Sequence, residues 1–579
     1  MERGIGTSRG IGIGHVLIVY NASAVVNRGT HYNAEEEKKR FFEARKTFIE
    51  QTEELLSELE KKLGESDKDA LVLKNQIYLA RDITTENEVV AAIDNSHICA
   101  EAAFDDVCNK LIQLFSSMDN PDMQQRVTDI QDMRERMIQI LQGTKAFDLT
   151  NLPDNTVIVA DEIKPSMTAS MDIAHVAGIV AEKGGDTAHA SILARALEIP
   201  AVLSVKGILQ KVKNGDSIII DGAYGEVFIN PTQRTFSIYE KKKKKYEEHI
   251  EELKTFINKS TETADGKKVM LAANIGGADE AAKAVKAGAE GVGLFRTEFL
   301  FLNKNALPTE EEQFEEYKKA AVLTKGMPLT IRTLDIGGDK DIPYMGLTKE
   351  TNPFLGYRAI RFCLDRVDIF TTQLRAILRA SAYGSIRIMI PMITSVNEVR
   401  QVKDMIKKIC SDLDHNGISY DKNIQTGVMI ETPAAAIMAD SIAQEVDFFS
   451  IGTNDLTQYT IAVDRCNENV AYLYSAFNPA VLRLIRRIIE CAHNAGIEAG
   501  MCGEAAANAL MAPILLSFGL DEFSVSTGKV LETRKTIADW SLKEAGLVTD
   551  KVMSMATEKE VTDYLSAVSY THLRAHETR

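Results

Sequence analysis

The stretch Asp447-Phe448-Phe449-Ser450-Ile451 runs directly into the polar residues Thr453-Asn454-Asp455 after a single glycine. A short apolar run that ends in polar residues is typical of a buried strand and the loop that follows it. Seven similar runs alternate with helix-like segments from Lys268 onward. The eight strands are expected at residues 269–273, 291–294, 329–332, 386–390, 427–430, 447–451, 497–501 and 522–525. Eight such units in about 260 residues predict a (β/α)8 barrel.

Polar side chains follow most of these predicted strands. In a (β/α)8 barrel, active sites lie at the C-terminal ends of the strands, so these side chains are expected at one mouth. They are Asn274, Arg296, Arg332, Glu431, Asn454, Asp455 and Cys502. The mouth would therefore combine arginines, two carboxylates, an amide and a thiol.

The arginines and carboxylates of this region indicate a phosphorylated ligand. Four arginines are the candidates for holding it: Arg296, Arg332, Arg358 and Arg465. A guanidinium group meets phosphate or carboxylate oxygens with two parallel hydrogen bonds. Glu431 and Asp455 suit Mg²⁺, which takes one or two protein carboxylates and completes its shell with water and substrate phosphate. A phosphorylated carboxylic acid would satisfy both sets, although each residue alone could be a surface charge or an ion-pair partner.

The N-terminal part of the chain has a different pattern. Residues 33–142 contain almost no proline or glycine and show helical periodicity, which predicts an all-helical block. From Asn155, short β-rich runs alternate with helical pieces, and the strand at residues 11–20 is expected to join them. The helical block would then be an insertion in an α/β unit. The lysines 241–245 lead into a polar segment that is most simply a solvated linker helix.

One histidine in the α/β unit stands out. Gly184-Gly185-Asp186-Thr187-Ala188-His189 runs straight into the helix-like residues 190–197. Two glycines permit a sharp turn, and the free N–H groups at a helix start favour an anion such as a phosphoryl group beside the imidazole. The alternative for His189 is a local cap or a buried hydrogen-bonding residue.

Length and composition limit the number of domains and the class of protein. A chain of 579 residues is too long for one core and predicts about three or four domains. The net charge of -16 argues against nucleic-acid binding and allows a basic protein partner. The seven cysteines lack metal or disulfide spacing, which suits a reducing compartment. No run reaches the ~20 apolar residues of a membrane span, and the start does not read as a signal peptide. We therefore expect a cytoplasmic protein without direct membrane insertion.

Two long signatures carry a family resemblance. The stretches from Gly184 to Arg195 and from Asp447 to Arg465 resemble those of the phosphoenolpyruvate-protein phosphotransferases, Enzyme I of the bacterial sugar phosphotransferase system. The resemblance covers nearly the whole chain, to about Ala545. It implies a multidomain α/β protein: a swivelling phosphohistidine α/β domain with an inserted all-helical subdomain, followed by a (β/α)8 barrel.

The resemblance also implies domain boundaries. These are a phosphohistidine domain at residues 1–32 and 144–230, a helical HPr-binding subdomain at 33–143, a linker helix at 231–262, a phosphoenolpyruvate-binding barrel and dimerisation domain at 263–545, and a C-terminal tail at 546–579. The barrel would make the protein a homodimer. The tail residues 569–579 show no apolar periodicity, so we expect a disordered or extraneous end.

The family's residue roles carry over to matching positions. His189 would accept the phosphoryl group from phosphoenolpyruvate through Nε2, release pyruvate and pass the group to the carrier protein HPr in the first step of sugar uptake. Arg296 and Arg332 would hold the phosphate, helped by Arg358 and Lys340. Arg465 and Asn454 would hold the substrate carboxylate and phosphate, and Glu431 with Asp455 would hold Mg²⁺.

Two further roles follow from the same resemblance. Cys502 matches the general acid that protonates C3 of the enolate, although a cysteine at a strand end is often only a small buried apolar residue. Thr168 matches a hydroxyl that hydrogen-bonds the active histidine, and its alternative is a helix cap. The acidic residues Glu65, Asp67, Asp69, Glu86 and Glu88 could steer HPr, but such a run is more often a solvated helix face.

The chain departs from the family pattern at two motifs. Asp186 stands where a basic residue is common, and Ser8-Arg9-Gly10 stands where Ser-Pro-Gly is common. A negative charge three residues before His189 is expected to slow phosphoryl acceptance at most.

Two other interpretations compete with this one. Pyruvate phosphate dikinase and phosphoenolpyruvate synthase share the histidine domain and barrel but need several hundred additional residues for ATP binding. A non-catalytic regulator could lose Glu431, Asp455 or Cys502, and this chain keeps all three. The absence of an added N-terminal sensory domain favours sugar uptake over nitrogen regulation.

Overall fold

The fold is known from a computed structural model. It describes residues 1–577 except residues 20–25, 27, 30–31, 64–67, 118–120, 145–148, 165, 168–170, 186–188, 303, 305, 338–341, 348–349 and 468. The chain divides into two compact units, Met1–Ile250 and Glu251–Arg579. Each is described here by itself.

An eight-stranded sheet organises the first unit within its described residues. Its strands are β1 Glu2–Arg3, β2 Ile5–Ser8, β3 Ile11–Val19, β4 Thr156–Ala160, β5 Val176–Ala181, β6 Ala201–Leu203, β7 Ser217–Asp221 and β8 Glu226–Ile229. Their order across the sheet is β1-β8-β7-β3-β4-β5-β6-β2. The central strands β3, β4, β5 and β6 run parallel, and the flanking strands pair antiparallel. Side chains of β4 alternate between two core clusters, so the sheet is buried on both faces.

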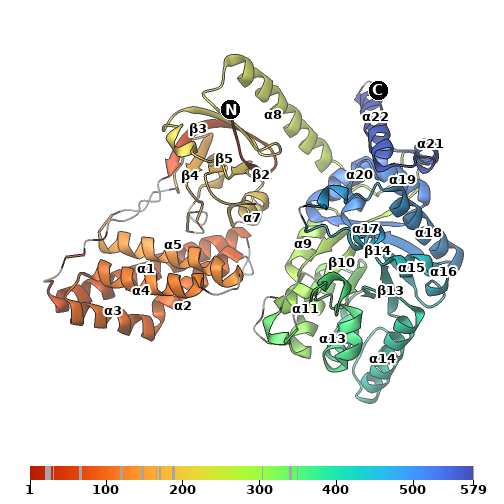
Figure 1. Ribbon diagram of the computed structural model, residues 1–579, viewed down its shortest axis with the longest axis horizontal. Helices are drawn as coiled ribbons and strands as arrows, with labels where there is room; N and C mark the ends of the chain where they lie inside the picture. Colours follow the sequence, from red (N-terminus) through yellow and green to blue (C-terminus); the bar gives the residue numbers. More distant parts are fainter. Residues whose placement is uncertain are drawn as a thin grey trace. The chain divides into compact units, whose positions relative to one another are not determined.

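A helical subdomain interrupts this sheet between β3 and β4. The helices described there are α1 Ala34–Leu63, α2 Lys68–Arg81, α3 Ile83–Ser96, α4 Ala100–Ser116 and α5 Pro121–Leu141. They bury an apolar cluster of their own, centred on Phe41, Phe48 and Phe104, and Figure 1 shows them gathered as one group. Since β3 pairs directly with β4, from His15↔Thr156 to Val19↔Ala160, the predicted insertion of an all-helical subdomain is confirmed.

Two more helices follow in the chain, and the second of them extends past the end of the first unit at Ile250. The short α7 His189–Ala196 packs beside β2 and β6, and the long α8 Gln233–Lys254 follows β8. The predicted lysine-rich linker helix corresponds to α8, where these lysines form ion pairs with Asp221, Glu247 and Glu248. The lysine run therefore surrounds this part of α8 with charged side chains, three of which are paired.

A closed barrel of eight parallel strands organises the described part of the second unit. The strands are β9 Met270–Ile275, β10 Val292–Arg296, β11 Leu329–Arg332, β12 Ile386–Ile390, β13 Gln425–Ile430, β14 Phe448–Ile451, β15 Glu498–Met501 and β16 Glu522–Ser526. Each pairs with the next, and β16 closes onto β9 from Glu522↔Met270 to Ser526↔Asn274. The predicted (β/α)8 barrel is confirmed.

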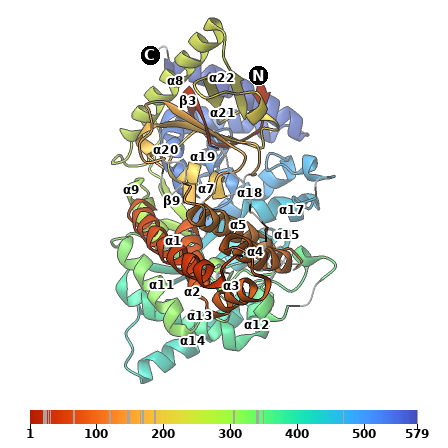
Figure 2. The ribbon, with the colours of Figure 1, turned by 90° about the vertical axis from the view of Figure 1, so that its left-hand side faces the viewer.

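Helices surround this barrel. They are α9 Ala278–Lys286, α10 Glu298–Leu302, α11 Glu310–Leu323, α12 Ile360–Asp365, α13 Val367–Ala380, α14 Val396–His415, α15 Pro433–Ile437, α16 Ala439–Ile442, α17 Thr453–Ile461, α18 Pro479–Ala495, α19 Ala512–Phe518, α20 Val530–Asp539, α21 Leu542–Met553 and α22 Glu558–Glu577. Figure 1 and Figure 2 both show α11, α13 and α14 together on the outside of the strands. Capping boxes at Thr309 with Glu312 and at Ser395 with Glu398 start α11 and α14.

The C-terminal segment corrects one expectation. The region predicted as a tail at residues 546–579, with a disordered or extraneous end at 569–579, is largely helical in α21 and α22, and the backbone of α22 continues to Glu577. The helix contradicts the expected disorder, and the expectation of an extraneous end stays a prediction. Val561 and Leu565 are almost fully buried in the barrel core. The prediction failed because it judged residues 569–579 alone, whereas the helical spacing of Val561, Leu565 and Val568 lies just before them.

Candidate active site

The C-terminal end of the barrel collects the predicted mouth residues. Arg296 and Arg332 are the last residues of β10 and β11, Glu431 follows β13, and Cys502 follows β15. Asn454 and Asp455 lie in the first turn of α17, directly after β14. Because parallel strands end at the same rim, residues far apart in the chain come to one mouth.

Two buried arginines form the centre of this mouth. Arg332 Nη2 donates to Glu298 Oε1 at 2.8 Å, and its Nη1 lies 3.1 Å from Asp335 Oδ2. Arg358 Nη2 donates to Asp335 Oδ1 at 2.9 Å and to Asp455 Oδ2 at 3.2 Å. Asp335 therefore bridges the two guanidinium groups.

The charge of these arginines is secured by their neighbours. Burial alone would lower the pKa of Arg332, but the carboxylates of Glu298 and Asp335 outweigh burial and raise it above the usual value. The pKa of Arg358 is raised in the same way, against burial, by Asp335 and Asp455. Both groups remain cations in a largely dry environment, where an anionic ligand is held more strongly than in water.

Two carboxylates lie beside the arginines. Glu431 is 2% exposed, and its Oε1 accepts a hydrogen bond of 2.6 Å from the backbone N–H of Met392. Burial, together with the nearby charges of Asp455 and Asp335, raises the pKa of Glu431 to about 8. Asp455 Oδ1 is buried and accepts no hydrogen bond within the described structure, and Arg465 Nη1 forms a 3.5 Å ion pair with it.

This arrangement fits a divalent cation. The raised pKa of Glu431 and the unsatisfied Asp455 oxygen both indicate negative charge that the arginines do not fully neutralise. Among described residues, no three His, Cys, Asp or Glu side chains gather as a complete metal site. Mg²⁺ does not need one, since water and substrate oxygens complete its shell.

Three candidate residues at the mouth are less buried. The exposed Arg296 guanidinium lies 4.8 Å from the ring centroid of Phe299. Asn454 is fixed by Glu504, to which it donates at 3.3 Å and from whose N–H it accepts at 3.2 Å. The side chain of Arg465 is 32% exposed. Solvent can therefore reach the guanidinium groups of Arg296 and Arg465 more readily than those of Arg332 and Arg358.

Cys502 combines a strand-end position with an apolar setting. It packs with Leu294, Met389, Met429 and Phe448, and its thiol lies 3.9 Å from the carbonyl oxygen of Ile451. Burial raises the pKa of Cys502 to about 11, so the thiol is protonated near neutral pH. That is the state a proton donor requires, and the packing also matches the alternative of a buried apolar residue.

The histidine loop is described in part. Helix α7 begins at His189, but the side chain of His189 and residues 186–188 lie outside the described residues. The loop before it turns at Gly184, whose φ of 102° favours glycine. The hydroxyl of Ser191 donates to Gly185 O at 2.5 Å, and that of Ser204 donates to Gly184 O. Thr168, Lys340 and Asp186 also lie outside the described residues.

Sequence reasoning missed the anionic partners of the arginines. Glu298 comes two residues after Arg296, and Asp335 comes three residues after Arg332. The prediction took one or two chemically active residues at or directly after each strand. A search one turn further along each loop would have found both carboxylates.

Comparisons with known proteins show what the whole chain is similar to. Residues 3–126 match the N-terminal domain of PEP-utilising enzymes, residues 152–225 their mobile domain and residues 250–542 their PEP-binding domain. The chain is 43% identical over 562 residues to the phosphoenolpyruvate-protein phosphotransferase of Bacillus sp. (strain S), covering 97% of both. It is 42% identical over 563 residues to that of Bacillus subtilis (strain 168), covering 97% of this chain and 98% of the relative.

The chain belongs to the phosphoenolpyruvate-protein phosphotransferase family. This confirms the predicted enzyme class, a transferase that uses phosphoenolpyruvate. An NMR solution structure of an Enzyme I protein is 30% identical, covers 43% of this chain and 100% of its own, and has a TM-score of 0.39.

The family matches fall on distinct parts of the phosphotransferase fold. The mobile-domain match contains β4 to β7 and α7, and therefore His189. The PEP-binding match contains every strand of the barrel and all the mouth residues. Across the residues that the structure describes, no helix is long and apolar enough to cross a membrane.

Proposed function

We propose that the protein transfers the phosphoryl group of phosphoenolpyruvate to Nε2 of its own His189 and then to the carrier HPr, releasing pyruvate. The reaction would be the first step of sugar uptake by the phosphotransferase system, carried out in the cytoplasm. The observation that carries the proposal is the buried pair Arg332 and Arg358, joined through Asp335 beside the carboxylates of Glu431 and Asp455.

The substrate would lie with its phosphate toward the arginines. Arg332 is already fixed and charged, and Arg296 at the neighbouring strand end would complete a clamp on the phosphate oxygens. Arg358 and Lys340 would assist. Arg465 and Asn454 would hold the carboxylate and the remaining phosphate oxygen at the opposite rim, where Glu504 orients the Asn454 amide.

Glu431 and Asp455 would hold Mg²⁺, in agreement with their unneutralised negative charge. When bound, the ion would neutralise charge on the substrate's phosphate and carboxylate oxygens. The backbone N–H of Met392 holds one Glu431 oxygen, and Arg358 holds one Asp455 oxygen. The other Glu431 oxygen would thus serve the ion, and the other Asp455 oxygen, which accepts no hydrogen bond but lies 3.5 Å from Arg465 Nη1, would be shared between the ion and that arginine.

The transfer step would break the bond between phosphorus and the C2 oxygen of phosphoenolpyruvate. The Nε2 lone pair of His189 would form the new bond to phosphorus, and the enolate of pyruvate would leave. The thiol of Cys502 would donate its proton to C3, giving pyruvate, and the thiolate would regain a proton from water. Arg296 and Arg332 would stabilise the phosphoryl oxygens throughout.

The histidine would act at two places in each cycle. The Thr168 hydroxyl would hydrogen-bond its imidazole, and the phosphohistidine domain would swivel between the barrel and HPr. Separate cores in the two units support such a movement, because no core cluster of described residues combines both.

HPr would dock on the helical subdomain. A hollow of about 560 Å³ lies between α3 and α4 and is lined by Glu88, Asp106 and Lys110 together with the apolar Ala92 and Val107. Because Asp106 already pairs with Arg28 at 2.6 Å, Glu88 would be the acidic contact for a basic group of HPr. Of the acidic residues considered from sequence, Glu86 is paired with Arg45, whereas residues 65 and 67 lie outside the described residues.

The barrel would also form a homodimer. Large apolar side chains are exposed near its mouth, with Leu355 at 66% and Tyr472 at 80% exposure. Exposed apolar groups of this size favour burial against a second chain. Sedimentation velocity over a range of concentrations would detect the dimer, and a monomer at every concentration would contradict it.

The main test is phosphoryl labelling. Purified protein is incubated with phosphoenolpyruvate labelled in the phosphoryl group and Mg²⁺, then offered HPr. We expect acid-labile, alkali-stable label on the wild type, none on His189→Ala, and transfer to HPr. If the wild type takes no label, the proposal is overturned. The effect of the Asp186 charge on phosphoryl acceptance would then be tested next.

A further inference from the structure

One buried amide on the outside of the barrel reaches the ends of two strands. Gln373 belongs to α13 and is 1% exposed. Its Oε1 accepts from the backbone N–H of Leu334 at 2.9 Å, and its Nε2 donates to Thr297 Oγ1 at 3.2 Å and to the Tyr317 hydroxyl at 3.3 Å. Both N–H groups and the oxygen are thus used.

The orientation of this amide follows from its partners. The backbone N–H of Leu334 can only donate, so the amide oxygen must face it. The NH₂ group then faces the two hydroxyls. A substitution by an apolar residue of similar length would leave the buried Leu334 N–H without its acceptor.

These contacts begin where the strand pairing ends. The register of β10 and β11 ends at Arg296↔Arg332. Thr297 follows Arg296, and its hydroxyl donates to the carbonyl oxygen of Arg332 at 2.8 Å. Gln373 therefore connects the two segments that follow β10 and β11. The connection lies just beyond the last paired residues of these strands, Arg296 and Arg332.

We propose that Gln373 is a positioning residue for phosphoenolpyruvate, because it fixes the spacing between Arg296 and Arg332. This rests on the proposed function, in which these arginines clamp the phosphate. Two guanidinium groups bind one phosphate well only if their separation is set in advance. The amide sets it from the far side of the strands, without touching the substrate.

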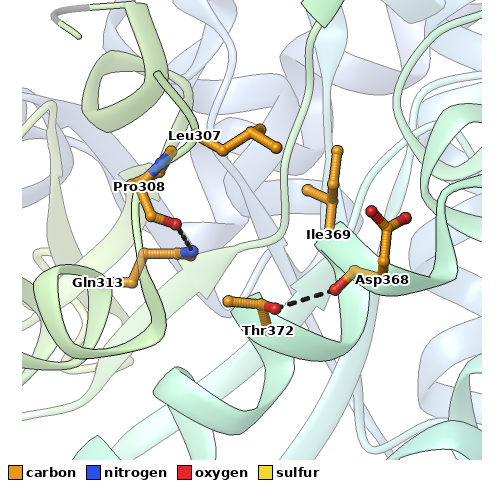
Figure 3. Close-up of a pocket in the computed structure, with 6 residues that line it drawn as sticks. All are labelled: Leu307, Pro308, Gln313, Asp368, Ile369 and Thr372. Carbon is orange, nitrogen blue, oxygen red and sulfur yellow. Dashed lines mark hydrogen bonds between the residues drawn. The ribbon is translucent and has the colours of Figure 1, made fainter. Parts of the chain in front are cut away.

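A second buried glutamine provides a matched comparison. Gln313 on α11 is also 1% exposed, and its Oε1 accepts from the same Tyr317 hydroxyl at 3.3 Å. Its Nε2 donates to Pro308 O at 3.1 Å, as Figure 3 shows. Gln313→Met removes an equally buried amide from the same chain of hydrogen bonds but leaves Thr297 and Leu334 untouched.

The experiment measures binding without transfer. Phosphoenolpyruvate with Mg²⁺ is titrated calorimetrically into full-length His189→Ala protein that carries a second substitution. We expect Gln373→Met to weaken binding about tenfold, as loss of a hydrogen bond that orients a ligand-holding group does in metal sites. Gln313→Met should bind as the parent does. Thr297→Val, which keeps the volume but removes the hydroxyl, should weaken binding in the same direction as Gln373→Met.

The outcomes separate this inference from the proposed function. If Gln373→Met and Gln313→Met weaken phosphoenolpyruvate binding equally, both amides contribute only to packing, and the inference is overturned. If Gln373→Met binds phosphoenolpyruvate as the parent does while Arg332→Ala loses binding, the inference about Gln373 is overturned and the proposed function is not. If Arg332→Ala binds as the parent does, the phosphate clamp in the proposed function is wrong.

Discussion

At the level of single residues, the barrel mouth is a balanced set of charges. Arg332 could be found from sequence because it ends a predicted strand, and Arg358 because it lies in a motif that carries the family resemblance. Their carboxylate partners Glu298 and Asp335 were not found, since no local pattern reveals which charges a fold brings together. The same holds for Gln373, whose importance depends on three partners on different elements.

Asp335 offers a test of this charge balance. Asp335→Asn removes the negative charge between two buried guanidinium groups, and breaking such a set costs about 1 to 3 kcal/mol when other partners remain. We expect the free energy of unfolding of the barrel unit to fall by that amount. The only tryptophan, Trp540, is buried in this unit, so its fluorescence in urea reports the change.

The control for Asp335 is an exposed ion pair in the same unit. Asp368 pairs with Arg366 at 2.8 Å, but its side chain is 65% exposed. Asp368→Asn should change the free energy of unfolding by less than about 1 kcal/mol. Similar effects of the two substitutions would contradict the importance of the buried bridge.

Cys502 allows a pH prediction. Because its folded pKa is about 11, the thiol is the dominant form below that pH and the reactive thiolate increases as pH rises toward it. Alkylation by iodoacetamide should spare Cys502 at pH 8 and still be accelerating at pH 10, whereas the exposed Cys466 reacts first. Peptide mass mapping measures both, and labelling of Cys502 at the rate of Cys466 at pH 8 would refute the prediction.

At the level of elements, most of the fold could be predicted from apolar runs and their spacing. The runs at residues 386–390 and 447–451 correspond to β12 and β14, and the strands Ile386–Ile390 and Phe448–Ile451 are buried throughout and pair on both sides. The final helix α22 was missed because its inward residues precede the polar end that was examined. The helical spacing of apolar residues can be recognised only when the stretch considered includes those residues.

Helix α21 supplies a prediction about glycine. Gly546 lies in the helix interior, and a Cβ placed there would meet no atom within 4 Å. Gly546→Ala should therefore stabilise the barrel unit by about 0.5 to 1 kcal/mol, because alanine loses less backbone freedom on folding. Urea unfolding followed by Trp540 fluorescence checks this, and a destabilised variant would mean that α21 is not helical there in solution.

At the level of the whole molecule, the chain consists of two units with independent cores. The alternation of strand-like and helix-like segments from Lys268 onward indicated the second unit in advance. Sequence could not reveal how the histidine loop would reach the barrel in the proposed cycle, since that depends on the movement of folded bodies and not on local preference.

Separating the units tests this independence. A chain that ends after α8, at Lys254, keeps His189, the helical subdomain and their cores but lacks the barrel. It should exchange a phosphoryl group with phosphorylated HPr at close to the full-length rate and take none from phosphoenolpyruvate. Gel assays with labelled HPr and labelled phosphoenolpyruvate measure both, and labelling of the fragment by phosphoenolpyruvate would show that the barrel is not needed.

The insertion of the helical subdomain has a consequence for how the protein is made. Strand β3 leaves the ribosome before α1 to α5, yet its partners β4 and β7 come only after them. During synthesis, an apolar strand must therefore wait without neighbours while the helical bundle folds beside it. Once folded, the bundle links the two halves of the sheet by a short connection. Its early folding therefore brings β3 and β4 near each other in space although they are far apart in the sequence. Substitutions that slow the bundle should thus reduce the yield of folded α/β domain without altering its final stability.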